Sequence, residues 1–137
     1  MDMDTMDEEI LAILKKDARE SYVNIANQLN TSEGTIRGRV KKLVEQGIIT
    51  RFTIRTKGKN VKALIAVQMD INAENPKWDK IVEIDGVEMV YEVSGDNDLI
   101  AMVDVMSTEN LNDIIEEIRG LGVKSTRTML ILKEHFS

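Results

Sequence analysis

The stretch SEGTIRGRVKKLVEQG, residues 32–47, decides the fold of the first third of the chain. Ser32 is a favourable helix N-cap, and Gly47 is a typical residue for ending a helix. At about 100° per residue, the apolar side chains between them fall on one side of a helix. The segment therefore predicts a helix with an anchored apolar side (Ile36, Val40, Leu43), an opposite polar side (Gly34, Thr35, Gly38, Lys41, Lys42) and two flanking arginines (Arg37, Arg39).

Two shorter helices are predicted upstream of this segment. Apolar residues follow Ile10 at helical spacing, and Asp4 and Asp7 ahead of it suit the positive end of a helix. A second short apolar stripe lies in residues 22–29, and residues 30–32 form a polar break before the third helix. Three short helices with a tight polar turn between the last two are typical of a helix-turn-helix.

Charge is distributed unevenly along the chain. The 137 residues carry a formal net charge of −6, with 42% apolar and 31% charged residues, as expected of a soluble globular protein. Residues 30–62 nevertheless hold nine basic and two acidic residues, whereas residues 63–137 hold six basic and fifteen acidic ones. A basic block beside an acidic domain favours an anionic partner for the first part alone. A solvated, charged helix surface is the alternative interpretation.

Composition also excludes several classes of protein. No apolar run approaches the ~18–20 residues of a membrane span, and no signal peptide is apparent. The chain has no Cys and one His, which excludes disulfides and thiolate zinc sites and disfavours His-dependent hydrolysis. We expect a cytoplasmic protein that is not an enzyme and needs no cofactor or membrane.

Residues 48–62 are predicted to form a strand followed by a Gly/Lys/Asn-rich connector. Arg51 and Arg55 alternate with apolar residues, which gives the strand one basic side. These arginines could contact phosphates, or the segment could be a plain hinge. The predicted organisation is therefore a helix-turn-helix domain in residues 1–50, a strand and hinge linker in 51–62, and a second domain in 63–137.

The hydrophobic period changes after residue 62. Strands are predicted in residues 63–71, 87–94, 99–106 and 125–133. Helices are predicted from Pro76 to about Gly86 and after Ser107, and residues 95–98 form a tight turn. The order β-α-β-β-α-β is that of a ferredoxin-like domain, so the fold class is α+β.

Both faces of the predicted sheet are apolar. A solvated sheet face should be polar, so we expect a second layer, supplied by another subunit in a homodimer because the chain is too short to provide it. Tolerated exposed aliphatic side chains are the alternative interpretation. The predicted helix-covered face contains Ile65, Val67, Met69, Val87, Met89, Tyr91, Val93, Leu99, Ala101, Val103, Leu130 and Leu132. The predicted open face contains Leu64, Ala66, Val90, Ile100, Met102, Met129 and Ile131.

Several motifs in fixed order span nearly the whole chain. They are Asp4-x-x-Asp7-x-x-Ile10-Leu11, Ser32-x-x-Thr35-Ile36-x-x-Arg39-Val40, Gly95-x-x-Asp98 and Thr126-x-Thr128-x-x-x-Leu132. Because it contains these motifs in this order, the chain resembles the leucine-responsive/asparagine regulator (Lrp/AsnC) family of archaeal and bacterial transcription factors. The resemblance implies a winged helix-turn-helix that binds a pseudo-palindromic operator in double-stranded DNA. It also implies a ferredoxin-like (RAM-type) domain that dimerises, senses an amino acid, and in many relatives assembles further into tetramers or octamers.

The resemblance also implies functional residues. DNA contacts would come from Ser32, Thr35, Arg37, Arg39 and Lys42, with Arg51 and Arg55 as backbone contacts. Effector contacts would come from Gly95, Asp96, Asn97, Asp98, Thr126, Thr128 and Leu130. A turn of exposed N–H groups beside a carboxylate could hold both ends of an α-amino acid, although its composition also suits an ordinary hairpin turn. Glu116 could reach a cationic side chain, which would favour lysine or arginine as effector.

Two other functions remain open from the residues alone. Sirohaem decarboxylase subunits share this resemblance, so an enzyme on the same scaffold is possible in principle. Such chemistry is expected to need basic side chains around an acidic tetrapyrrole, whereas His135 lies in the acidic domain. A regulatory module without DNA is the third alternative, and the basic third helix argues against it.

Overall fold

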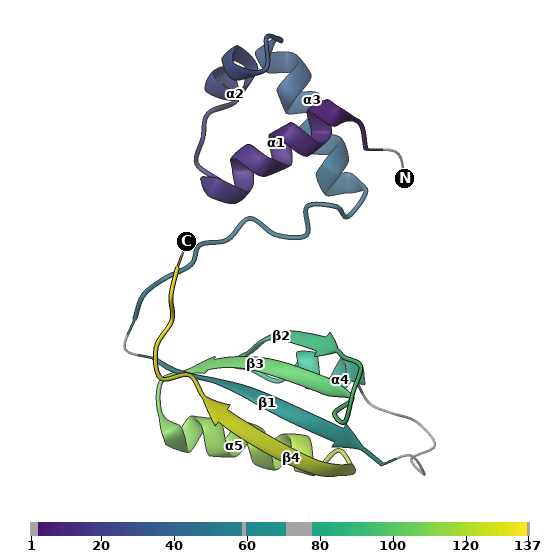
Figure 1. Cartoon of the computed structure of the whole chain (residues 1–137), viewed down its shortest axis with the longest axis vertical. Coiled ribbons are helices and arrows are strands. Elements are labelled where there is room, and N and C mark those ends of the chain that lie inside the picture. The colour runs from purple at the N-terminus through teal and green to yellow at the C-terminus, as the bar shows by residue number, and fades with distance from the viewer. Residues whose placement is uncertain (1–2, 59, 71–77, 137) are drawn as a thin grey trace. The chain divides into compact units, whose positions relative to one another are not determined.

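The computed structural model describes residues 3–58, 60–70 and 78–136. The chain divides into two compact units, Met1–Thr56 and Lys57–Ser137 (Figure 1). The first unit is helical, and the second combines a sheet with helices. This confirms the predicted α+β class.

Three helices build the first unit: α1 (Thr5–Lys16), α2 (Tyr22–Gln28) and α3 (Glu33–Glu45). Asp4, Ser21 and Ser32 are their N-caps, and each side chain accepts a hydrogen bond from the backbone three residues later. These bonds satisfy N–H groups that a helix start leaves without partners. The apolar sides of the helices meet in one core, formed by Ile10, Leu14, Ile25, Ala26, Ile36 and Val40.

The turn between α2 and α3 depends on a left-handed residue. Asn30 has φ +54°, a conformation that Asn tolerates better than most residues do. The next residue, Thr31, donates its N–H to the carbonyl of Ala26, which closes the turn tightly. The short turn brings α3 back across α2, and the helix-turn-helix prediction is confirmed.

The predicted strand within residues 48–62 is wrong for its first part. Residues 48–58 contain no strand, and regular structure resumes at Val61. A strand needs a neighbour to accept and donate its backbone hydrogen bonds. Within the described residues the sheet consists of four strands of the second unit, and this segment is not among them.

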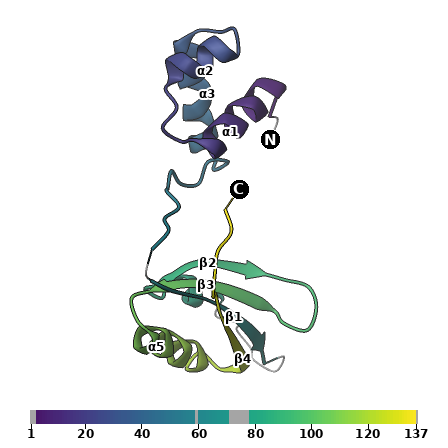
Figure 2. The same cartoon turned by 60° about the vertical axis from the view of Figure 1, so that its left-hand side comes forward.

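The second unit has the predicted order of strands and helices. Its elements are β1 (Val61–Met69), α4 (Trp78–Val82), β2 (Val87–Glu92), β3 (Leu99–Val105), α5 (Thr108–Arg119) and β4 (Val123–Leu130). The strands form an antiparallel sheet in the order β2-β3-β1-β4. Both helices lie on the same face of the sheet, and among the described residues of this unit no helix covers the other face, which we call the open face (Figures 1 and 2).

The core of this unit lies between the sheet and the two helices. Alternate residues of β1 and β3 point into it, including Ile65, Val67, Leu99 and Val103. The helices contribute Ile81, Leu111, Ile114 and Ile118, and the turn after α4 contributes Ile84. Ser107 caps α5 as predicted, through a hydrogen bond from the N–H of Asn110.

The predicted faces of β2 are reversed from Met89 onward, whereas Val87 packs on the core as predicted. A register shift lies between Val87 and Met89, so Val90 pairs with buried Ala101 and packs on the core. Met89 and Tyr91 instead pair with Met102 and Ile100 on the open face. One extra residue in a strand turns every later side chain to the opposite face.

Three further predictions concern the last strand, the start of the fourth helix and membrane-spanning segments. The last strand spans Val123–Leu130 rather than residues 125–133, so Leu132 lies beyond it and is exposed. Pro76, the predicted start of the fourth helix, lies outside the described residues. Within the described part of the chain, no helix combines the length and apolar character of a membrane span.

Candidate DNA interface and effector site

Helix α3 has a buried side and an exposed side. Ile36, Val40 and Leu43 are almost completely buried and fix the helix on the first unit. The opposite side exposes Gly34, Arg37, Gly38, Lys41 and Lys42 to solvent. An anchored helix with donors on its free side can enter the major groove of DNA, where base edges present acceptors.

The start of α3 carries two hydroxyl side chains and one exposed arginine. The hydroxyls of Ser32 and Thr35 are 2.8 Å apart, and Ser32 Oγ also accepts from the N–H of Thr35 at 3.1 Å. Each hydroxyl retains further capacity for a hydrogen bond to DNA. Arg37 is exposed, ion-paired with Glu33 one turn earlier, and 5.6 Å from the ring centre of Tyr22. The Glu33 carboxylate raises the pKa of Arg37.

Arg39 faces its own molecule rather than the exposed side of α3. Its Nη1 lies 2.5 Å from Oδ2 of Asp4 and 3.2 Å from Oδ1 of Asp7, both at the start of α1. Hydrogen bonding from Arg39 lowers the pKa of Asp4, and the two carboxylates raise the pKa of Arg39. Both contacts are made by Nη1, so the ion pairs hold the guanidinium beside the start of α1.

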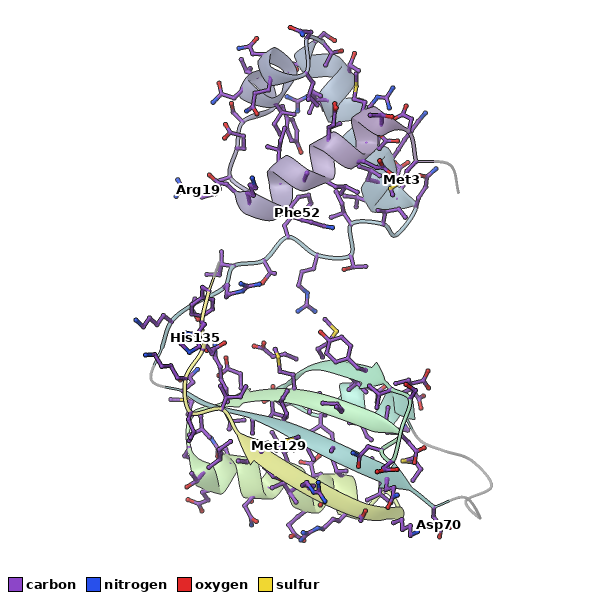
Figure 3. All side chains as sticks on the ribbon, viewed as in Figure 1. Met3, Arg19, Phe52, Asp70, Met129 and His135 are labelled. Atoms are coloured by element: carbon purple, nitrogen blue, oxygen red, sulfur yellow. The ribbon has the colours of Figure 1, made fainter. Side chains whose placement is uncertain are left out.

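The remaining basic candidates are accessible. Lys42 is exposed on the last turns of α3. Arg51 and Arg55 are exposed on the segment that follows α3, and Phe52 of the same segment is labelled in Figure 3. Their position after the recognition helix fits the predicted contacts with the DNA backbone, which remain a prediction.

The turn predicted to bind an effector is attached to the end of β1. The carboxylate of Asp98 accepts from the N–H of Met69 at 2.7 Å, and the N–H of Asp98 donates to the carbonyl of Val67 at 2.9 Å. Gly95 has φ +109°, which suits glycine in the turn. One oxygen of Asp98 therefore supports the fold, and the other is available to a cationic group.

Sequence reasoning missed the residue that connects this turn to β4. Gln68 donates from Nε2 to the carbonyl of Asp96 at 2.9 Å, and its Oε1 accepts from the hydroxyl of Ser125 at 3.2 Å. The available signal was that Gln68 interrupts the apolar residues 63–69 of β1. Its side chain joins the turn and the start of β4 into one polar cluster.

The structure brings some predicted effector residues together and separates others. Thr126 pairs with Val67, close to the turn, whereas Leu130 pairs with Ala63 near the other end of β1. At ~3.3 Å per residue, Leu130 lies roughly 13 Å farther along β4 than Thr126. Thr128 lies between them and pairs with Ile65. Glu116 is exposed on α5 and forms an ion pair with Arg119 at 3.1 Å.

Both units match known protein families. Residues 3–50 match a family described as winged helix-turn-helix DNA-binding, and residues 62–137 match the Lrp/AsnC ligand binding domain. The chain is 42% identical to the HTH-type transcriptional regulator LysM of Saccharolobus solfataricus, covering 98% of this chain and 96% of that relative. It is 39% identical to LysM of Sulfurisphaera tokodaii, covering 98% and 99%.

Solved structures give the same result. The leucine response regulatory protein LrpA of Mycobacterium tuberculosis superposes with a TM-score of 0.84 at 25% identity, covering 98% of this chain and 96% of that one. A feast or famine regulatory protein of M. tuberculosis, complexed with L-methionine, also gives 0.84 at 25% identity, covering 99% and 96%.

Fold, exposed basic helix and similarity together define a DNA-binding transcriptional regulator with a separate ligand-binding domain. The chain belongs to the Lrp/AsnC family.

Proposed function

We propose that this regulator reads a specific operator as a homodimer and that an amino acid controls its binding. The observation that carries the DNA part is the two-sided character of α3. Its buried residues hold the helix in place, while Arg37, Gly38, Lys41 and Lys42 are exposed on the opposite side. Paired α3 helices would read half-sites about one helical turn apart, ~34–36 Å, in a pseudo-palindrome.

We assign base reading to the first turns of α3 and backbone contact to its end. Ser32, Thr35 and Arg37 offer directional donors and acceptors, which suit base edges. Lys42 presents a flexible point charge, which suits phosphate. Arg51 and Arg55 extend the basic surface beyond the helix. The matches to named transcriptional regulators favour this role over an enzyme.

The DNA proposal is tested with a duplex that the wild-type protein selects from a library of random sequence. Lys42→Met should weaken binding to selected and scrambled duplexes alike and reduce the salt slope by about one. Lys80→Met on α4 removes the same charge from the other unit and should change neither quantity. Failure of the wild-type protein to enrich any sequence would contradict specific recognition.

The open sheet face supports the homodimer. Met89, Tyr91 and Met129 are between 41% and 52% exposed there, and Ile100 and Met102 lie between them on β3. Met129 is labelled on β4 in Figure 3. Clustered exposed aliphatic and aromatic side chains mark an interaction surface. Because the strands of two copies can present the same face, a two-fold contact covers it symmetrically. Further assembly into tetramers or octamers would join such dimers.

An amino acid fits the cluster at the end of β1. Gly95 and Asp96 are exposed, so the turn can offer backbone N–H donors to a carboxylate, and Oδ1 of Asp98 can offer an acceptor to an ammonium group. Thr126 adds a hydroxyl beside them on β4. The relative complexed with L-methionine supports an amino acid as the class of ligand. A role for Glu116 in choosing lysine or arginine requires it to exchange Arg119 for the ligand.

A thermal-shift screen against the twenty amino acids tests the effector proposal. A ligand that binds the native state raises apparent stability by about 2.7 kcal/mol at a hundredfold excess over its dissociation constant. Asn97→Ala should reduce that shift, whereas Asn112→Ala, exposed on α5, should leave it unchanged. An absence of stabilisation by all twenty would contradict an amino acid effector.

Because its partner is DNA, we place the regulator in the cytoplasm.

A further inference from the structure

One ion-pair cluster in the DNA-binding unit has no part in the contacts proposed above. Arg39 of α3 reaches back to Asp4 and Asp7, which lie 35 and 32 residues earlier in the chain. Its side chain is 31% exposed, that of Asp7 is 15% exposed and that of Asp4 is 55% exposed, so the cluster is part-buried at Asp7 and exposed at Asp4. It is adjacent to Val40, which packs in the core against α1 and α2.

The two carboxylates are themselves fixed in place. The N–H of Asp7 donates to Oδ1 of Asp4 at 2.9 Å, and the N–H of Asp4 donates to Oδ2 of Asp7 at 3.3 Å. This capping box leaves the other oxygen of each carboxylate for Arg39. The cluster therefore joins the first turn of α1 to the middle of α3 through a rigid acceptor pair.

We infer that Arg39 is a positioning residue that sets the orientation of α3 on α1 and does not itself contact DNA. The helix has 13 residues and is therefore ~20 Å long. A tilt of about 10° around its middle would move its ends by roughly 2 Å, enough to spoil a set of directional contacts. The inference rests on the proposed reading of a specific operator by α3.

The direction in which one substitution changes operator affinity distinguishes positioning from direct contact. Asp7→Asn removes a negative charge near the DNA-binding surface but keeps an oxygen that can accept from Asp4. If Arg39 contacts DNA, this change frees the guanidinium and strengthens binding. If Arg39 positions α3, the change weakens operator binding, by roughly three- to tenfold, as is common for coupled neighbours.

Binding is measured on the full chain with the selected duplex and a scrambled duplex, over a range of salt concentrations. Arg39→Met should weaken operator binding while leaving the salt slope and the affinity for scrambled DNA nearly unchanged. The double variant Arg39→Met/Asp7→Asn should be no weaker than either single variant. Lys42→Met is the matched control, because it should lower the slope and both affinities.

Charge reversal gives a second, independent measurement. Arg39→Asp should lose operator selectivity, and adding Asp7→Arg should recover much of it, because the ion pair is restored in the opposite sense. Far-UV circular dichroism at the assay temperature shows that each variant is folded. Tighter binding by Asp7→Asn, a slope reduced by about one in Arg39→Met, or no recovery in the reversed pair would overturn the inference. Loss of selection by the wild-type protein would instead refute the proposed function.

Discussion

Arg37, Arg39 and Lys42 lie within six residues of one helix, yet their charged groups have different surroundings. Arg37 pairs with Glu33 of its own helix, Arg39 pairs with α1, and Lys42 is exposed on the free side. Helical spacing predicted that the two arginines flank the polar side. Helical spacing could not predict the partners of Arg39, because Asp4 and Asp7 come close to Arg39 only when α1 packs on α3.

The pairing of Asp4 predicts a dependence of stability on pH. Its pKa is lower in the folded chain than the ordinary value of 3.8, with Arg39 as the largest cause. The resulting stabilisation is present above that ordinary value and disappears as the pH falls through the lower, folded value. Asp4→Asn keeps a good N-cap but loses the charge, so it should lower the melting temperature at neutral pH.

The difference in melting temperature between wild type and Asp4→Asn should shrink to near zero in strong acid. Thermal unfolding of the full chain, followed by far-UV circular dichroism at several pH values, measures it. Glu9→Gln, exposed on the same helix, is the control and should show no such convergence. A difference that is constant with pH would show that the ion pair does not contribute.

At the scale of elements, α3 contains two glycines that the fold does not require. A Cβ at Gly34 or Gly38 would meet no atom within 4 Å, and neither residue has a left-handed backbone. Glycine in an exposed helix interior costs roughly 1 kcal/mol relative to alanine. Their position on the free side of α3 favours close approach of the backbone to DNA as the reason for this cost.

Gly38→Ala should therefore move stability and binding in opposite directions. We expect unfolding free energy to increase by about 0.5–1 kcal/mol and operator affinity to decrease. Chemical denaturation and titration with the selected duplex measure the two quantities. Asn112→Ala on α5 should stabilise without affecting DNA binding. A gain in stability with unchanged affinity would show that Gly38 does not approach the DNA.

Gly86, between α4 and β2, is a glycine that the fold does require. Its φ is +96°, and a Cβ would lie 2.8 Å from Cγ1 of Val105 and 2.9 Å from Cδ1 of Ile114. We expect Gly86→Ala to lower unfolding free energy by about 1–3 kcal/mol through strain and overpacking. Gly122 has a similar φ of +80°, but a Cβ there would meet no atom within 4 Å. The loss of unfolding free energy in Gly122→Ala therefore measures backbone strain without overpacking. Equal losses in denaturant unfolding would show that overpacking contributes nothing.

Elements with strong local signals were predicted best. The N-cap Ser32 and the acidic start of the first helix were predicted, because such side chains bond to nearby backbone and depend little on the rest of the fold. The strand expected in the first part of residues 48–62 and the face of β2 from Met89 onward were predicted wrongly. Both depend on neighbouring strands, and alternation alone specifies neither a partner nor a register shift.

At the scale of the whole molecule, the open sheet face predicts the oligomeric state. Met89→Glu places a charge among Tyr91, Ile100 and Met102, and burying it against a second copy would be costly. Static light scattering should then fall from a multiple of the 15.5 kDa chain mass toward one chain. Val82→Glu, half-exposed on the helix-covered side, should leave the mass unchanged. Retention of a dimer by Met89→Glu would place the interface elsewhere.

By itself the sequence determined the α+β class, the order of elements, the helix starts and the buried side of α3. These features come from periodicity and capping, which act over a few neighbouring residues. Only the tertiary structure decided that Arg39 holds α1, that Gln68 connects Asp96 to Ser125, and that Met89 and Tyr91 lie on the open face. Each of these joins residues far apart in the chain, and packing alone sets which groups come within bonding distance.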